Sequence, residues 1–318
     1  MFSQTKRKWN IEKGRLGLLL VIAALVVFFS ISSPYFLKSK NLLNMLVSVS
    51  VIGIISTTMT TAIICRGPDL TVGAMVAMVG CLEAKLVMEM GLPWYIGILS
   101  SLGVGCVAGF LSGVIITRFT LAPMIVTLGM MNVVRGLCYV MTGGLSTFIQ
   151  HPALTVFGKG RLVGIPISVI IMISCFVLFE VISKKTVFGR WIYACGSNRE
   201  ACRLAGIQVN RIVIAVFTLS GIFSAIAGVV MVGIGGTAMP STGESYNMDA
   251  ITAVLLGGTA LDGGSGSVLG TLLGLITIGI ISNGLTLLNV PSYWQTVAKG
   301  ALLLAAVILD KRRSVSRR

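Results

Sequence analysis

The sequence predicts an all-α polytopic membrane protein with about ten transmembrane helices. The chain of 318 residues is 55% hydrophobic and only 11% charged, and its mean hydropathy is +0.95. About a quarter of the residues of an ordinary soluble domain are charged. The apolar residues form repeated runs that are long enough for helices spanning a bilayer. The charged residues gather in the tails and in alternate loops.

The predicted spans follow one another with mostly short connections. The first span follows the basic segment Lys6–Lys8, and a basic segment before an apolar run is also typical of a signal peptide. It is about 18 residues long and ends in Ser-Ser-Pro without a small-residue cleavage pattern, so we interpret it as a retained helix. The ten predicted ranges are 16–33, 42–65, 70–88, 94–117, 123–142, 165–183, 212–236, 248–261, 267–288 and 293–309.

The distribution of basic residues predicts that both ends of the chain lie in the cytoplasm. With the N-terminus inside, 18 of the 25 lysines and arginines fall in the tails and inward loops, and four fall in the outward loops. The positive-inside rule then gives an N-terminal tail (1–15), a single transmembrane domain (16–309) with an inward loop at 184–211, and a basic tail (310–318). The net charge of +15 does not indicate nucleic acid, because the charges do not gather on one exposed face.

The segment Met248–Gly270 predicts an interrupted helix. Its apolar run stops at a glycine-rich turn after about fourteen residues, whereas about twenty are needed to cross a bilayer. Short or broken helices are tolerated in membranes only where the loose backbone is buried in protein or lines an aqueous path. The sequence therefore indicates a passage through the membrane and not a plain anchor.

A weak internal sequence repeat predicts two five-helix halves of opposite orientation. Gly105, Gly109 and Gly113 recur at four-residue spacing in the fourth span, as Gly266, Gly270 and Gly274 do in the ninth. Each glycine helix is followed by a loop with proline and then by a helix with a basic residue before glycine, Arg135-Gly136 or Lys299-Gly300. Such glycine faces let neighbouring backbones approach closely. Chance likeness between glycine-rich membrane helices is the alternative.

The loop 184–211 is expected to contain a short helix. Ser197 with Glu200 forms the pattern of a capping box, and Gly206 suits the left-handed position that ends a helix, so we predict a helix over Asn198–Ala205. So short a helix is marginal alone and should dock on something. Two interpretations stay open: a coupling element for a cytoplasmic partner, or an amphipathic segment on anionic lipid headgroups.

The same loop resembles a known family. Glu200-Ala201-Cys202 followed at a distance by Gly206 is similar to the EAA loop of ABC-importer permeases, with Cys202 in place of the second alanine. From about residue 40 onward, the chain resembles the ribose/xylose/galactose-type sugar permeases of ABC importers. The motifs are Thr186, Phe188, Gly189, Arg190, Tyr193, Ala194, Gly196, Asn198, Ala201, Gly206 and Ile207; Asp69-Leu70-Thr71-Val72-Gly73; Pro123 to Gly136; Ile251 to Gly270; Asn283-Gly284; Trp294-Gln295; and Lys299-Gly300.

The resemblance implies an architecture similar to the vitamin B12 importer permease, in the bacterial inner (cytoplasmic) membrane. A second copy or a paralogue would complete the path, ATP-binding subunits would dock on the coupling loop, and a periplasmic or lipid-anchored binding protein would deliver a monosaccharide-like substrate. ATP and magnesium would belong to the partner, because this chain has no GxxxxGK[ST] phosphate loop. The implied coupling residues are Ser197, Asn198, Arg199, Glu200, Ala201, Arg203, Leu204 and Gly206.

The chain also departs from the family pattern. Arg66-Gly67-Pro68 stands where the family usually has Gly-Gly-Ile, and Thr58, Thr71 and Ala74 are further replacements. The resemblance therefore does not name the sugar.

Polar residues within the spans are the candidates for a transport path or gate. A neutral sugar needs hydroxyls, amides and loose backbone with weak binding, which Thr58, Thr61, Asn132, Asn283 and Gln295 offer. Hydrogen bonding between helices is the alternative role of each.

Three charged residues complete the candidate set. Asp69 is predicted first as the N-cap of the third span, with a gate role as the second reading. Arg135 and Lys299 cost about 2.5 to 3.5 kcal/mol each at mid-membrane, so they are expected to hold broken-helix ends or face the path. Lys299 could instead extend to the interface.

Two rival functions are weighed against the permease. An ion-coupled secondary transporter would favour a carboxylate deep in the membrane, and the acidic residues fall mostly at the ends and loops of the predicted spans. A membrane-embedded enzyme has little support, because one histidine and no clustered carboxylates leave no constellation for catalysis or metal binding. We expect no catalytic residue and no cofactor bound by this chain.

Overall fold

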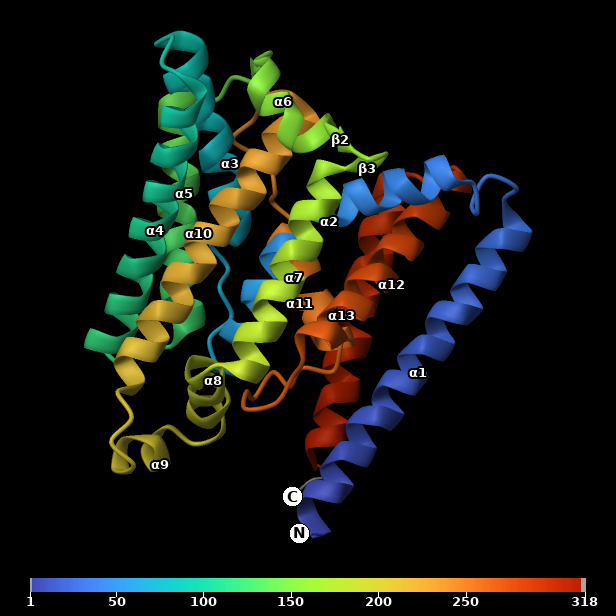
Figure 1. Ribbon diagram of the computed structural model, residues 1–318, viewed down its shortest axis with the longest axis vertical. Coiled ribbons are helices and arrows are strands. Elements are labelled where there is room, and N and C mark those ends of the chain that lie inside the picture. Colours follow the sequence, from blue (N-terminus) through green and yellow to red (C-terminus); the bar gives the residue numbers. More distant parts are fainter. Residues whose placement is uncertain (1, 316–318) are drawn as a thin grey trace.

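The computed structural model describes residues 2–315, with side chains for residues 16–308, 310 and 311. The predicted tails therefore fall partly outside the described residues, and where their backbone is described it continues the first and last helices. The chain forms an elongated helical bundle in which α8, α9 and both termini lie at one end, and α6, β2 and β3 lie at the other (Figure 1).

Helices account for most of the described backbone. Each of the ten predicted ranges contains a helix, although α1 begins well before residue 16 and α11 ends before residue 261. The elements are α1 (Phe2–Ser32), α2 (Ser39–Ile64), α3 (Val72–Glu83), the π-helix η1 (Ala84–Glu89), α4 (Trp94–Arg118), α5 (Pro123–Thr142), β1 (Thr147–Phe148), α6 (Pro152–Lys159), β2 (Arg161–Leu162), β3 (Ile165–Pro166), α7 (Ile167–Lys185), α8 (Val187–Ser197), α9 (Arg199–Leu204), α10 (Val209–Gly235), β4 (Thr237–Ala238), α11 (Tyr246–Leu256), α12 (Val268–Leu287) and α13 (Ser292–Val315).

Six of these helices are long and apolar enough to cross a membrane by length and composition. They are α2, α4, α5, α7, α10 and α12. The apolar part of α1, Leu16–Ser32, is shorter, and α3 and α11 have only 12 and 11 residues. The protein is thus an all-α polytopic membrane protein. The ten crossings stay a prediction.

The core forms around α2. Its side chains from Val49 to Ile63 pack with apolar side chains of α7, α10, α11 and α12 in the largest hydrophobic cluster. From Val49 to Ile64 this helix is buried all round, and its residues there are apolar or small hydroxyl residues. α1 lies along the outside and meets the bundle through Phe29 and Phe36, which pack near Met45 and Ile280.

The two glycine faces let neighbouring helices approach closely, as the sequence predicts. A Cβ added at Gly109 of α4 would lie 2.3 Å from the Phe217 carbonyl oxygen of α10, and one at Gly274 of α12 would lie 2.1 Å from the Ala253 carbonyl oxygen of α11. Only hydrogen fits at such positions. The two glycine helices nevertheless meet different partners, because α4 packs on α10 whereas α12 packs on α11.

Two small antiparallel strand pairs lie at the end of the bundle that is remote from α9. β1 pairs with β4, so that Thr147 lies opposite Ala238, and β2 pairs with β3 in a hairpin around the left-handed residues Val163 and Gly164. The helix α6 between these strand pairs and the helix α8 within the loop 184–211 are two elements that the sequence analysis does not predict.

Candidate functional site

The loop 184–211 forms two short helices in succession. α8 begins at Thr186, whose hydroxyl accepts a hydrogen bond from the Gly189 N–H at 3.1 Å. α9 begins at Asn198, whose side-chain oxygen accepts from the Ala201 N–H at 3.0 Å. The predicted capping box is therefore wrong: Ser197 is the last residue of α8, and its hydroxyl donates back to the Tyr193 carbonyl.

The end of α9 follows the prediction. Gly206 has φ +78° and the Ile207 N–H donates to the Cys202 carbonyl at 2.9 Å, a bond that closes a helix C-terminus. The Glu200 and Arg203 side chains lie 3.6 Å apart on the exposed face, and Leu204 is 90% exposed. α9 is thus a short helix that is capped at both ends, and its Leu204 side chain is exposed.

The C-terminal end of α8 is held by the end of α2. Gly196 lies against the backbone of α2, since a Cβ there would be 1.8 Å from the Ile64 carbonyl oxygen. Arg66 reaches the carbonyl groups that end α8, with Nε donating to Gly196 at 2.5 Å and Nη2 donating to Ser197 at 2.8 Å. These carbonyls have no partner within the helix, so the guanidinium satisfies them and complements the helix dipole.

Arg66 makes these contacts from a strained backbone position. Its φ is +64°, in the left-handed region that non-glycine residues rarely adopt. Such a conformation persists where the surrounding structure fixes it. The α2–α3 connection is thereby tied to the short helices.

The glycine-rich turn after α11 joins the same contact. The Gly264 N–H donates to the Ile64 carbonyl at 2.8 Å, and the Tyr193 hydroxyl of α8 donates to the Gly266 carbonyl at 3.1 Å. Gly263 and Gly264 both have positive φ, and a Cβ at Gly264 would be 2.6 Å from the Ser197 Oγ. We call residues 64–66, 193–199 and 263–266 the hub.

Two further hydrogen bonds lie in the hub or directly beside it. Arg199 of α9 donates through Nη2 to the Cys65 carbonyl at 3.0 Å. At the end of α13, the Asp310 carboxylate accepts from the Leu261 N–H at 3.0 Å. The helical backbone breaks at two places here, the α2–α3 connection and the glycine-rich turn after α11. Both breaks hydrogen-bond directly to α8, and the first also to α9.

The hub also buries two thiols, those of Cys65 and Cys195. Cys195 and Cys202 pack in one apolar cluster with Cys65, and all three are free. Burial raises the pKa of the Cys195 thiol to about 12, and the neighbouring Cys202 contributes to the shift. Cys195 therefore stays protonated near neutral pH and serves as a packing residue.

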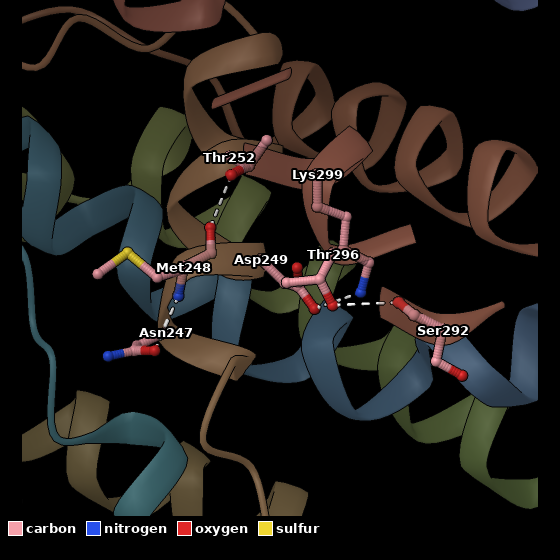
Figure 2. A network of polar contacts seen from close by, with 7 residues as sticks. All are labelled: Asn247, Met248, Asp249, Thr252, Ser292, Thr296 and Lys299. Carbon is pink, nitrogen blue, oxygen red and sulfur yellow. Dashed lines mark hydrogen bonds and ion pairs between the residues drawn. The ribbon is translucent and has the colours of Figure 1, made fainter. Parts of the chain in front are cut away.

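The basic residues of α5 and α13 meet on one segment, α11 and the chain that enters it. Arg135 Nη1 donates to the Thr242 carbonyl at 2.7 Å and also to the Pro240 carbonyl. The Lys299 ammonium lies 2.8 Å from the Asp249 carboxylate, in the first turn of α11 (Figure 2). Thus α5, through Arg135, bonds to the segment that precedes α11, and α13, through Lys299, bonds to α11 itself.

Figure 2 shows the local hydrogen bonds in the first turn of α11. The Asn247 side-chain oxygen accepts from the Met248 N–H at 2.9 Å, and the Thr252 hydroxyl donates to the Met248 carbonyl at 2.7 Å. The Asp249 side chain is 6% exposed and the Lys299 side chain 29% exposed. The ion pair is therefore mostly withdrawn from solvent, with the lysine nearer to the surface.

The other predicted path residues lie on four different helices, and only Thr58 and Thr61 are neighbours, one turn apart in α2. Thr58 and Thr61 are buried in α2 and donate to the carbonyls of Ile55 and Thr58. Asn283 and Asn41 exchange two hydrogen bonds of 2.9 and 3.0 Å between α12 and α2.

Gln295 and Asn132 lie on the outer helices. Gln295 donates to the Val290 carbonyl at 3.0 Å and so holds the start of α13. Asn132 is exposed on the outer face of α5.

Asp69 lies within the α2–α3 connection and not at the N-cap of α3. α3 begins at Val72 with Thr71 before it, so the N-cap prediction is wrong by two residues. One Asp69 oxygen accepts from the Thr71 N–H at 2.9 Å and from its hydroxyl at 2.5 Å. The residue is 1% exposed, so the carboxylate fixes a tight turn.

Comparison with known proteins assigns the family. Residues 41–307 match the family described as "Branched-chain amino acid transport system / permease component". The chain belongs to this permease family. The permease is 41% identical over 302 residues to a ribose import permease protein of Bacillus subtilis, with 94% of each chain covered. It is 35% identical to an L-arabinose ABC transporter permease protein of Azospirillum brasilense (96% of this chain, 89% of the relative) and 31% identical to a fructose import permease protein of Rhizobium meliloti (92% and 84%).

No solved structure matches the permease. Its relatives are transport permease subunits, so the permease is a transport subunit and not an enzyme. Among the described residues, no group of three or more histidine, cysteine, aspartate or glutamate side chains could hold a metal ion.

Several functional residues of the permease escape the sequence analysis. Asp249 and Glu83 lie at helix ends, as expected for the acidic residues, but both are buried, at 4% and 0% exposure. Arg66 was noted only as a departure from the family, although it holds α8. The left-handed Arg66 in the run Arg-Gly-Pro carries no signal in sequence, whereas a lone aspartate in the first turn of an interrupted helix could have indicated a partner for Lys299.

Proposed function

We propose that the permease forms the membrane path of an ATP-driven importer for a monosaccharide-like substrate. Ten helices would cross the bacterial inner membrane, as two inverted halves, with both termini and the hub on the cytoplasmic side. The grouping of α8, α9 and both termini at one end of the bundle supports this orientation (Figure 1). The positive-inside distribution of lysine and arginine agrees with it.

The hub is the observation that carries the proposal. α9 hydrogen-bonds to the end of α2 through Arg199 and Cys65, and α8 hydrogen-bonds to the turn after α11 through Tyr193 and Gly266. A displacement of α8 and α9 would therefore act directly on both breaks in the membrane helices. This arrangement suits a passive conduit that is reshaped from the cytoplasmic side.

A separate ATP-binding subunit would supply the force at α9. Leu204, 90% exposed next to a solvated ion pair, is the apolar anchor that such a partner would cover. ATP and magnesium would bind in that subunit. A periplasmic or lipid-anchored binding protein would deliver the substrate, and the ribose, arabinose and fructose relatives indicate a sugar.

A second copy or a paralogue would complete the path against α5. Gly129 and Gly136 have no atom within 4 Å of an added Cβ, and Asn132 is exposed between them. An uncovered amide flanked by glycines on an apolar span suits a close helix contact or a polar path better than lipid. Asn132→Cys should then crosslink two copies in membranes, whereas a cysteine in place of Val177, exposed on α7, should not.

The decisive experiment tests the ATPase contact. Leu204→Asp should abolish copurification of the ATP-binding subunit and substrate uptake, while the isolated permease keeps its unfolding temperature. Val163→Asp is the matched control, because Val163 is 95% exposed at the opposite end of the molecule. Unchanged copurification with Leu204→Asp, or uptake that survives without the ATPase, would overturn the proposal and favour an ion-coupled transporter.

A further inference from the structure

A cavity lies beside the hub where α9 faces the ends of α4 and α10. Its volume is about 300 Å³, and residues of α4, of the turn after it, of α9 and of the first turns of α10 line it. A second hollow of about 320 Å³ adjoins it through the shared residues Arg203, Val209 and Asn210, and adds Gln208 and Arg211. Each hollow has room for several waters, since one water occupies about 30 Å³ in the liquid.

The polar lining of this double cavity is mainly cationic. Arg199, Arg203 and Arg211 contribute three positive charges, and Glu200 contributes one negative charge, 3.6 Å from Arg203. Thr117, Thr120 and Asn210 add hydroxyl and amide groups. The remaining lining is aliphatic. Such a lining fits one anionic group with hydrogen-bond acceptors, because a neutral or cationic group would leave the arginines unmatched.

Arg199 carries a donor that the protein does not use. Its Nη2 donates to the Cys65 carbonyl, whereas its Nε is buried without a hydrogen-bond partner among the described residues. A buried guanidinium N–H without a partner costs free energy. The start of α10, a helix of 27 residues, lies in the same lining through Val209 and Asn210. The positive end of its dipole favours an anion at this place.

The surroundings of the cavity indicate an occupant with an apolar tail. Phe119 and Leu121, in the turn after α4, are 65% and 46% exposed, and α4 and α10 both run from this point into the apolar bundle. A soluble phosphate compound would leave these side chains in water. A phospholipid would cover them with its acyl chains and place its phosphate between the arginines. Basic pockets between membrane helices bind anionic headgroups in this way.

We propose that this cavity binds the headgroup of an anionic phospholipid, with Arg199 and Arg203 donating to its phosphate. The site shares Glu200 and Arg203 with the surface assigned to the ATPase, but lipid binding does not require that partner. The proposal is therefore tested on the isolated permease, and its failure leaves the ATPase contact untouched.

The test measures lipid retained by purified permease, without the ATPase, by native mass spectrometry. The wild-type protein should retain phosphatidylglycerol at least about tenfold better than phosphatidylcholine, since each arginine near a lipid phosphate is worth about 1 kcal/mol. Arg203→Glu should lower phosphatidylglycerol retention by about tenfold or more, because it also leaves Glu200 without its partner. Arg203→Gln should lower it less.

The matched control is Arg190→Glu, which reverses an exposed arginine of α8 that does not line the cavity. It should retain phosphatidylglycerol as the wild-type protein does. Equal retention of the two lipids by the wild-type protein, or equal retention of phosphatidylglycerol by Arg203→Glu and Arg190→Glu, overturns the proposal. Complete displacement of the lipid by millimolar inorganic phosphate also overturns it, because the site would then take a soluble anion. Unfolding temperatures of the variants exclude misfolding as the cause of a loss.

Discussion

Gly196 of α8 and Ile64 of α2 are in direct backbone contact: a Cβ at Gly196 would lie 1.8 Å from the Ile64 carbonyl oxygen and 2.7 Å from the Gly264 nitrogen. Backbone atoms from α8, α2 and the turn after α11, which are far apart in sequence, are therefore in contact at this one position. Backbone atoms cannot move aside as a flexible side chain can, so this contact fixes the spacing between α8 and both breaks in the membrane helices.

The first prediction follows from that contact. Gly196→Ala should push α8 away from α2 and destabilise the permease by about 1 to 3 kcal/mol, the range for an extra methyl group in a packed site. Substrate uptake should fall with it, because the hub no longer transmits movement. Gly206→Ala is not a suitable control, because Gly206 has a positive φ. Gly103→Ala is suitable, because Gly103 has open space and lies outside the hub.

Thermal unfolding in detergent and uptake into vesicles check this prediction. Gly103→Ala should leave the unfolding temperature unchanged or raise it slightly. An unaltered unfolding temperature and full uptake for Gly196→Ala would show that the hub is loosely packed.

The second prediction concerns Arg66, whose guanidinium holds the last carbonyls of α8. Arg66→Gly relieves the left-handed strain of about 1 to 3 kcal/mol and removes two charge-assisted hydrogen bonds. These changes offset each other, so the unfolding temperature should change little while uptake drops. The ATPase should still copurify, because α9 keeps its own cap.

The readout for Arg66 is the ratio of ATP hydrolysed to substrate transported in reconstituted vesicles. That ratio should rise in Arg66→Gly and should recover in part in Arg66→Lys, which restores the charge without the planar fork. A normal ratio in Arg66→Gly would remove Arg66 from the coupling path.

The third prediction concerns the ion pair between α11 and α13. Lys299→Met leaves the Asp249 carboxylate unpaired at 6% exposure, and removing one partner of a buried pair costs about 3 to 5 kcal/mol. Asp249→Asn should cost less, because Lys299 at 29% exposure can reach solvent. The double variant should recover much of the stability lost in Lys299→Met.

A double-mutant cycle of unfolding free energies measures this coupling. Additive losses in the double variant would show that the two side chains do not interact. Lys85 and Glu89, an exposed ion pair on η1, serve as the matched control and should contribute less than about 1 kcal/mol.

The sequence predicted those parts of the fold that depend on local pattern. Apolar runs located the helices, and Gly206 located the end of α9. Ser197 and Asn198 are both good capping residues, and Glu200 three positions after Ser197 favoured the wrong one. The structure selects Asn198 because α8, which the sequence analysis did not predict, continues through Ser197.

Pairings between distant segments could not be predicted in the same way. Lys299 and Asp249 are 50 residues apart, and Arg66 and Gly196 are 130 apart, so no periodicity connects them. The glycine faces show the same limit: their spacing predicted close approach, but the partner of the Gly105–Gly113 face is α10 and was not evident. Such partners are decided by tertiary packing, which depends on the whole bundle at once.

The last prediction tests that glycine face with a control in the same helix. A Cβ at Gly109 would lie 2.3 Å from the Phe217 carbonyl oxygen, whereas one at Gly103 meets no atom within 4 Å. Gly109→Ala should therefore destabilise the permease by about 1 to 3 kcal/mol, because α4 and α10 must separate. Gly103→Ala should be neutral or slightly stabilising, since alanine favours a helix more than glycine does. Unfolding temperatures of the two variants give the comparison, and equal losses would mean that α4 and α10 are not in backbone contact along this face.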